Sequence, residues 1–149
     1  ERVTKLKPNL IGSFAPKLDR AQSIDGFFYP LYDVKAKFTV VAFFEPSCGH
    51  CKTEIPELHE KVFRGLQQYD VQVYAFYTQS NKTEWEKFIE TKGLHDWINV
   101  WDPNNFTDFR NKYDVYATPT VFLLDENKKI IAKRVDIKTI ISIIKEKAK

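Results

Sequence analysis

The sequence predicts a mixed α/β sandwich in which helices cover a central, mostly parallel sheet. Apolar runs suited to buried strands alternate with stretches of helical periodicity, and a polar turn joins two strand-like stretches near the C-terminus. Alternating strands and helices favour a parallel sheet, and the late hairpin adds an antiparallel edge. With 149 residues, of which 43% are hydrophobic, we expect one domain spanning residues 1–149.

The first predicted strand follows an irregular N-terminal segment. Three prolines and two glycines interrupt residues 1–36, where we expect a loop and a short hairpin. Residues 38–44 are almost entirely apolar and rich in β-branched and aromatic side chains. Such a run is typical of a strand that is buried on both faces of a sheet.

A helix is predicted after this strand. One helix face collects side chains at spacings of three and four: Cys51, Ile55, Leu58, Val62 and Leu66. Pro56 lies inside this stretch, and its missing N–H is expected to kink the helix. A second buried strand is predicted at residues 71–77, where the pattern alternates and then becomes apolar.

The second helix is predicted over residues 81–93. Asn81 and Glu84 have the spacing of a capping box, and Gly93 is placed to end the helix. A short strand at 97–101 and a short helix at 106–113 then follow.

The C-terminal third completes the order β-α-β-α-β-α-β-β-α. Residues 120–124 and 129–135 flank a polar turn and predict a hairpin. Asp136 can cap a last helix, whose apolar stripe spans residues 137–144.

Charge and composition exclude several functional classes. The net charge is +3, and the basic and acidic residues are interspersed, so no nucleic-acid footprint or polybasic membrane patch is present. No apolar run approaches the roughly 18 residues that span a bilayer. The sequence contains no Met, so we expect Glu1 to begin a processed form or a piece of a longer precursor.

The sharpest chemical signal is Cys48-Gly49-His50-Cys51, at the junction of the first strand and the first helix. A thiol is nucleophilic as the thiolate, which a helix N-terminus and a protonated His50 both favour at Cys48. Cys51 lies one turn along, on the apolar stripe, and should be more buried. We therefore expect Cys48 to attack a disulfide and Cys51 to resolve the mixed disulfide.

Other uses of two cysteines are weaker interpretations. A disulfide across so short a loop removes little entropy from the unfolded chain. A zinc site needs two more ligands, and His59 and His95 show no paired spacing. Haem attachment needs His directly after the second cysteine, where this chain has Lys52. Redox exchange without a metal or bound cofactor is favoured.

These residues resemble a known family. Residues 43–52 resemble the active-site segment of thioredoxin-fold thiol:disulfide oxidoreductases, and Cys48-x-x-Cys51-x-x-Glu54-x-Pro56 resembles the TlpA/ResA branch. Ala117-Thr118-Pro119-Thr120 resembles the cis-proline loop of that family. The resemblance runs from about Gly12 to the C-terminus. It implies a thioredoxin-like three-layer sandwich with an N-terminal hairpin extension (1–36), a core (37–149) and a βα unit inserted at about 80–113.

The resemblance also implies roles for the remaining site residues. Pro46, Ser47, Gly49 and His50 form the active-site loop. The backbone of Thr118, beside Pro119, pairs with an extended substrate segment by strand addition.

Two departures from plain thioredoxin concern the positions of a tryptophan and of a buried acid. Ser47 stands where thioredoxin has Trp, and Ala42 stands where it has the acid. Glu54 flanks the stripe that contains Cys51, so its carboxylate could carry a proton to Cys51. The alternative is a solvated glutamate on the helix surface.

The predicted function is thiol:disulfide exchange with extracytoplasmic proteins. The protein is expected to act as a reductant, and a separate thiol donor then reduces its oxidised form. A membrane-bound protein is one candidate for that donor. We expect a monomer in the bacterial periplasm, anchored or part of a larger precursor, without nucleic-acid partners. Gly49-His50 resembles the dipeptide of protein disulfide isomerases, which keeps isomerase or oxidant activity open. A binding module without turnover, for partner proteins or copper, is a further alternative, and a peroxidase is disfavoured because Glu45-Pro46-Ser47 lacks the spaced Pro and Thr of peroxiredoxins.

Overall fold

The structure is a computed structural model that describes residues 9–149, and it confirms the mixed α/β fold. Six strands form one sheet in the order β1-β4-β3-β2-β5-β6. They are β1 (Gln22–Ser23), β2 (Phe38–Phe44), β3 (Val71–Tyr77), β4 (Ile98–Trp101), β5 (Thr120–Leu124) and β6 (Ile130–Lys133). β2, β3 and β4 pair in parallel, whereas β5, β6 and β1 join as antiparallel strands.

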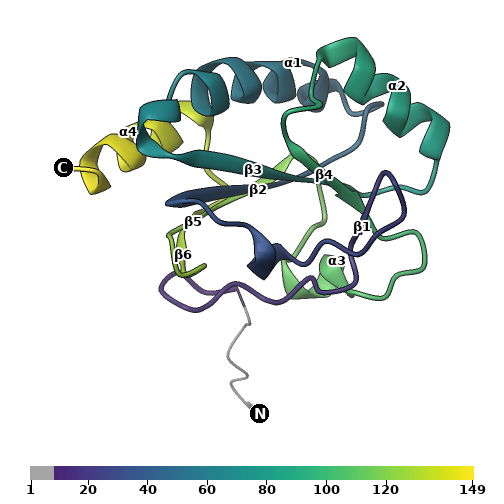
Figure 1. Cartoon of the computed structure of the whole chain (residues 1–149), viewed down its shortest axis with the longest axis horizontal. Helices are drawn as coiled ribbons and strands as arrows, with labels where there is room; N and C mark the ends of the chain where they lie inside the picture. The colour runs from purple at the N-terminus through teal and green to yellow at the C-terminus, as the bar shows by residue number, and fades with distance from the viewer. Residues whose placement is uncertain (1–8) are drawn as a thin grey trace.

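Helices lie on both faces of this sheet. The α-helices are α1 (Gly49–Glu57), α2 (Lys82–Lys92), α3 (Phe109–Lys112) and α4 (Ile137–Lys147). Shorter elements are the 3₁₀ helices η1 (Leu31–Asp33) and η3 (Gln67–Tyr69) and the π-helix η2 (Leu58–Arg64). Figure 1 shows α1, α2 and α4 above the sheet, with α3 and the N-terminal segment below it. This arrangement forms the predicted three layers.

The central strand β2 supplies both cores. All seven of its residues are buried, and alternate side chains point to opposite faces. Val40 and Ala42 pack in the cluster under α1, α2 and α4, whereas Val41 and Phe43 pack with α3 and the N-terminal segment. The C-terminal end of β2 is therefore held from both sides, and the active-site loop begins there.

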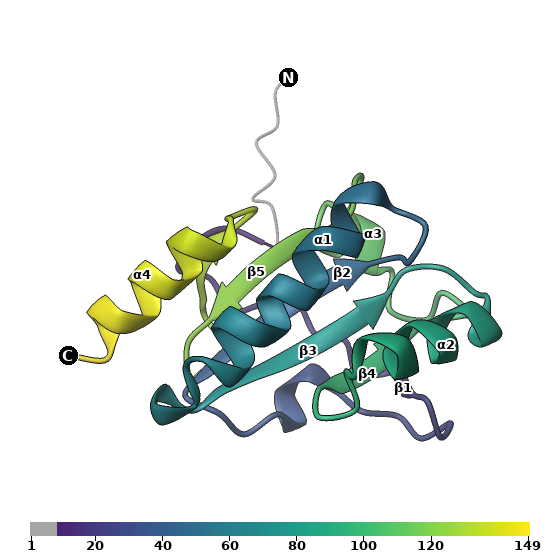
Figure 2. The ribbon, with the colours of Figure 1, turned by 90° about the horizontal axis from the view of Figure 1, so that it is seen from above.

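The predicted helix over 51–66 is divided in two. α1 contains Pro56, which lacks the N–H for one i→i−4 bond, and the chain continues after Glu57 as the π-helix η2. At its end Gly65 N–H donates to the Glu60 carbonyl, an i→i−5 bond of 3.0 Å. Figure 2 shows the two segments as one continuous coil across the sheet.

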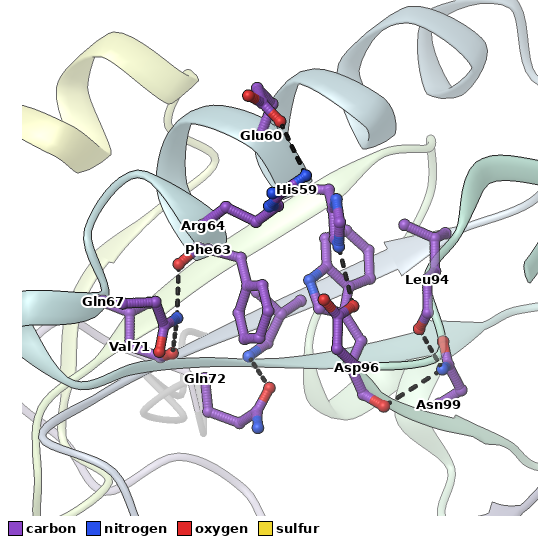
Figure 3. Close-up of polar contacts among 12 residues, drawn as sticks. His59, Glu60, Phe63, Arg64, Gln67, Val71, Gln72, Leu94, Asp96 and Asn99 are labelled. Atoms are coloured by element: carbon purple, nitrogen blue, oxygen red, sulfur yellow. Dashed lines mark hydrogen bonds and ion pairs between the residues drawn. The ribbon is translucent and has the colours of Figure 1, made fainter.

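Polar contacts tie η2 to the segment before β4, as Figure 3 shows. His59 Nε2 lies 2.8 Å from Asp96 Oδ1, and the imidazole packs between the rings of Phe63 and Trp97. His59 is therefore a packing residue with an acidic partner.

The N-terminal segment forms the predicted hairpin and also extends the sheet. The N-terminal hairpin forms, with Tyr29 N–H donating to the Ala21 carbonyl at 2.8 Å, but its first arm also joins the sheet as the edge strand β1. The part of the predicted extension at residues 1–8 lies outside the described residues.

Only one of the two hydrogen bonds of the predicted capping box forms at the start of α2. Asn81 Oδ1 accepts from Glu84 N–H at 3.1 Å. The Glu84 carboxylate does not reach the Asn81 N–H and instead accepts from the Tyr77 hydroxyl at 2.8 Å. Tyr77 ends β3 beside this turn, and its hydroxyl oxygen accepts the hydrogen bond from the Asn81 N–H. Gly93, with φ of 66°, ends the helix as predicted.

Candidate active site

Cys48 is the N-cap of α1. Its backbone is extended, and its sulfur accepts a hydrogen bond from the Cys51 N–H at 3.2 Å. N-cap side chains accept from the N2 or N3 amide, and the positive end of the helix dipole favours a negative acceptor there. The capping position therefore favours a thiolate over a thiol at Cys48.

The loop before β5 supplies the second contact of Cys48. β5 pairs antiparallel with β2 so that Thr120 lies opposite Phe43, and this register carries the preceding loop to the start of α1. The Cys48 thiol lies 3.0 Å from the Thr118 carbonyl oxygen, to which it can donate. The Thr118–Pro119 peptide bond is cis, and both residues are half-buried.

The two sulfurs differ in their tendency to ionise. Burial raises the pKa of Cys48, but hydrogen bonds with the side chains of Cys51 and Thr118 and with the main chain of Cys51 and His50 outweigh burial and leave that pKa below its ordinary value. Burial, followed by the hydrogen bond with Cys48, raises the pKa of the Cys51 thiol to about 12. At neutral pH the Cys48 sulfur is therefore the more readily ionised of the two.

Glu54 lies on the side of α1 that faces α4 and the Thr118–Pro119 loop. It is half-buried and lines a small hollow with Pro119 and Val121, whose far wall is formed by Ile137 and Ile140 of α4. The structure thus brings Glu54 next to the predicted substrate loop, one turn beyond Cys51.

The active-site loop is largely open to solvent. Ser47, Gly49 and His50 are exposed and Pro46 is half-buried. His50 acts on the Cys48 sulfur through its main-chain N–H, which lowers the pKa, where the sequence predicts an effect of the imidazole.

Glu45 is a site residue that sequence reasoning missed. Its carbonyl accepts from the Cys48 N–H at 3.2 Å, and its carboxylate accepts from the Ser47 hydroxyl at 2.6 Å. These bonds close the turn between β2 and α1. An acid directly before Pro46 was the available signal.

The described part of the chain offers neither a cluster of metal ligands nor a membrane-spanning helix. Within residues 9–149, no three His, Cys, Asp or Glu side chains lie close enough to hold a metal ion. Over the same residues, no helix combines the length and the apolar character needed to cross a membrane.

Comparisons with known proteins point to one kind of chemistry. Residues 11–133 match the AhpC/TSA family. The chain is 30% identical over 120 residues to the thiol-disulfide oxidoreductase ResA of Geobacillus thermodenitrificans. That match covers 80% of this chain and 66% of the relative's length.

Solved structures confirm the thioredoxin-like fold. A domain of a possible thiol-disulfide isomerase from Cytophaga hutchinsonii superposes with a TM-score of 0.85 at 39% identity, covering 93% of this chain and 92% of that one. The thioredoxin domain of a thiol-disulfide oxidoreductase from Bacteroides vulgatus has a TM-score of 0.82 at 23% identity, covering 94% and 99%. Both agree with the sheet and helices described above.

Proposed function

Because this chain belongs to the AhpC/TSA family, we propose that it is a thiol:disulfide oxidoreductase that exchanges electrons with protein substrates through Cys48 and Cys51. The proposal rests mainly on the surroundings of the Cys48 sulfur, which caps α1 and contacts the Thr118 carbonyl and whose pKa is lowered. A partly exposed thiolate beside a buried second thiol suits two-step disulfide exchange.

The exchange proceeds in two displacements. The Cys48 thiolate attacks one sulfur of a substrate disulfide, which forms a mixed disulfide and expels the other substrate sulfur as a thiolate. Cys51 then loses its proton and attacks the Cys48 sulfur, which releases the second substrate thiolate. Two electrons have passed to the substrate, and a separate thiol donor reduces the Cys48–Cys51 disulfide for the next cycle.

The second displacement needs a base. The pKa of Cys51 is raised to about 12, so few Cys51 side chains are ionised at neutral pH. We assign the proton transfer to Glu54, which lies one turn along α1 and lines the hollow beside Pro119. Thr118 presents its backbone to the substrate segment, which we expect to bind extended beside the loop.

Paired cysteine variants test this function. Cys48→Ser should abolish the reduction of insulin disulfides, because Ser supplies no thiolate. Cys51→Ser should retain the first displacement and accumulate a mixed disulfide with a substrate, visible as a mass increase that dithiothreitol removes. Full insulin reduction by Cys48→Ser would refute the proposal.

Isomerase or oxidant activity is the second candidate. Gly49-His50 resembles the isomerase dipeptide, and the Cytophaga relative bears an isomerase description. A redox titration against glutathione separates the two. A potential near −270 mV, as in thioredoxin, supports a reductant, and one near −180 mV, as in the isomerase, supports the alternative.

We place this activity outside the cytoplasm, in a bacterial periplasm, with the chain acting as a monomer on protein thiols and disulfides. The resemblance of Cys48-x-x-Cys51-x-x-Glu54-x-Pro56 to the TlpA/ResA branch supports this setting. Fractionation of cells that express the full-length product tests it, since recovery in the cytoplasm would exclude the periplasm.

A further inference from the structure

Tyr116 is the most exposed large hydrophobic side chain among residues 9–149, at 77%. It lies two residues before Thr118, whose carbonyl oxygen is 3.0 Å from the Cys48 sulfur. We propose that Tyr116 recognises an apolar side chain that flanks the substrate cysteine, an inference that rests on the proposed exchange activity.

Its place in the chain puts Tyr116 on the rim of the active site. Two residues of chain span at most about 7 Å, so the Tyr116 main chain stays within that distance of Thr118. A substrate segment that lies along the Thr118 backbone with its cysteine at Cys48 therefore runs near the Tyr116 main chain, and we infer that the exposed ring meets it there. The residues on either side of the substrate cysteine are the ones within reach.

The segment that carries Tyr116 is held rigidly. Tyr113 and Val115 are buried, and the Tyr113 hydroxyl donates to the Pro16 carbonyl. The Arg134 guanidinium donates to the Asp114 carbonyl, and the Tyr116 hydroxyl donates to the Asp114 carboxylate at 3.3 Å. A preorganised aromatic side chain loses little conformational entropy when a partner packs on it.

Three of the other exposed aromatic rings in the described chain already have cationic partners, and Phe27 lies on the hairpin of β1, away from β2. The side chain of Arg20 lies over Phe28 and Phe106, and the ammonium of Lys129 lies over Phe14. Tyr116 instead presents its ring to solvent, two residues along the chain from the carbonyl that contacts the Cys48 sulfur. Tyrosine is enriched at interface hot spots because it combines a large apolar face with a polar tip. The ring therefore selects for an apolar or aromatic neighbour of the substrate cysteine.

Two disulfide peptides test this inference. They are identical except for the residue next to the cysteine, which is Phe in one and Gly in the other. The wild-type protein should reduce the Phe peptide with about tenfold higher kcat/KM, mostly through a lower KM. Tyr116→Ala should lose this preference, and Tyr116→Phe, which keeps the ring, should retain most of it.

Phe27→Ala is the matched control. Phe27 is 74% exposed, but it lies on the hairpin of β1, which β4 and β3 separate from β2. Its removal should leave the peptide preference and the rate of Cys48 alkylation by iodoacetamide unchanged. Tyr116→Ala should also keep the wild-type alkylation rate, because it does not alter the hydrogen bonds to the Cys48 sulfur.

The outcomes separate the two proposals. An equal preference for the Phe peptide in wild type and Tyr116→Ala overturns the role of Tyr116 while leaving the exchange activity intact. Failure of the wild type to reduce either peptide, with normal Cys48 alkylation, overturns the exchange activity itself and the recognition with it.

Discussion

The two cysteines lie three residues apart, yet their surroundings drive their pKa values in opposite directions. Cys48 caps a helix and gathers hydrogen bonds at a partly exposed sulfur, whereas Cys51 turns into the core beneath α1. Burial acts on both thiols, and the hydrogen bonds reverse its effect at Cys48 alone. In the proposed exchange, this difference lets the Cys48 sulfur attack while Cys51 stays protonated until the second displacement.

Alkylation of the reduced protein should report this difference directly. The iodoacetamide rate should rise with pH through the Cys48 pKa and level off, with a midpoint below the ordinary pKa of a cysteine thiol. Cys51 should react in the folded protein only at strongly alkaline pH, since its pKa is about 12. Mass spectrometry should find one adduct per chain at pH 8, none in Cys48→Ser, and two after denaturation. Two adducts on the folded chain at pH 8 would contradict the assignment.

The role of Glu54 can be separated from that of the cysteines. Glu54→Gln keeps the shape of the side chain but removes its capacity to accept a proton, so resolution by Cys51 should slow by at least about tenfold. Quenched-flow measurement should then show a longer-lived mixed disulfide and an unchanged rate of Cys48 alkylation.

Glu57→Gln provides the comparison for Glu54. Glu57 lies three residues further along α1, is exposed and pairs with Lys61 at 3.2 Å. We expect wild-type resolution from this variant. Equal rates in both variants would make Glu54 a solvated surface residue, the alternative that its sequence position left open.

Sequence reasoning reached the cysteines and Pro119 because their chemistry depends on residue type and spacing. It missed Glu45, because the carbonyl that accepts from the Cys48 N–H gives no signal in the residue type, and the acid before Pro46 was the one available clue. It also missed Tyr116, because only the fold shows that this side chain is exposed and lies two residues from the Thr118 carbonyl that contacts the Cys48 sulfur. The place of Tyr116 near Cys48 in the fold depends on how β5 registers against β2.

At the scale of elements, the long helix over the sheet is the main departure from the predicted pattern. A periodicity of three and four continues through Leu66, but Pro56 breaks the hydrogen-bond ladder and η2 follows with wider turns. A pattern of apolar spacing does not distinguish α from π geometry over two turns, since both keep one face toward the core. The residues predicted to cap helices were placed correctly: Asn81 and Gly93 lie at the two ends of α2, and Asp136 lies at the start of α4.

The end of η2 makes Gly65 intolerant of a side chain. Its φ of −73° is ordinary, but a Cβ there would lie 2.6 Å from the Lys61 carbonyl oxygen. Gly65→Ala should therefore lower the free energy of unfolding by about 1–3 kcal/mol through backbone displacement, as measured by urea denaturation. Gly49→Ala, where a Cβ meets open space in the first turn of α1, should be neutral or stabilising by up to about 1 kcal/mol. Equal stability of the two variants would rule out the contact.

At the scale of the whole molecule, the segment before β2 belongs to the core. Leu18, Leu31 and Val34 are buried in one cluster with Phe43 and Phe76 of the central strands. Gly12 N–H donates to the Ile130 carbonyl at 2.8 Å, which ties the segment to β6. Composition could not reveal this, because the segment has no periodicity and its apolar side chains are spaced by prolines and polar residues.

Replacement of one buried residue tests whether this segment and the central sheet unfold together. Leu18 is fully buried, so Leu18→Ala should leave a cavity and lower the free energy of unfolding by about 2–4 kcal/mol. Ile11→Ala, at an exposed apolar position of the same segment, should change it by less than about 0.5 kcal/mol.

Urea unfolding followed by two probes checks this expectation. Trp85 and Trp97 belong to the core on the other face of the sheet, the one that α1, α2 and α4 cover. Their fluorescence therefore reports a region that does not include Leu18. If the molecule is one cooperative unit, Leu18→Ala should shift the fluorescence transition and the far-UV circular dichroism transition by the same amount. A fluorescence midpoint that stays at the wild-type urea concentration would instead make residues 9–36 an appendage that unfolds on its own, leaving the sheet and the Cys48 site intact.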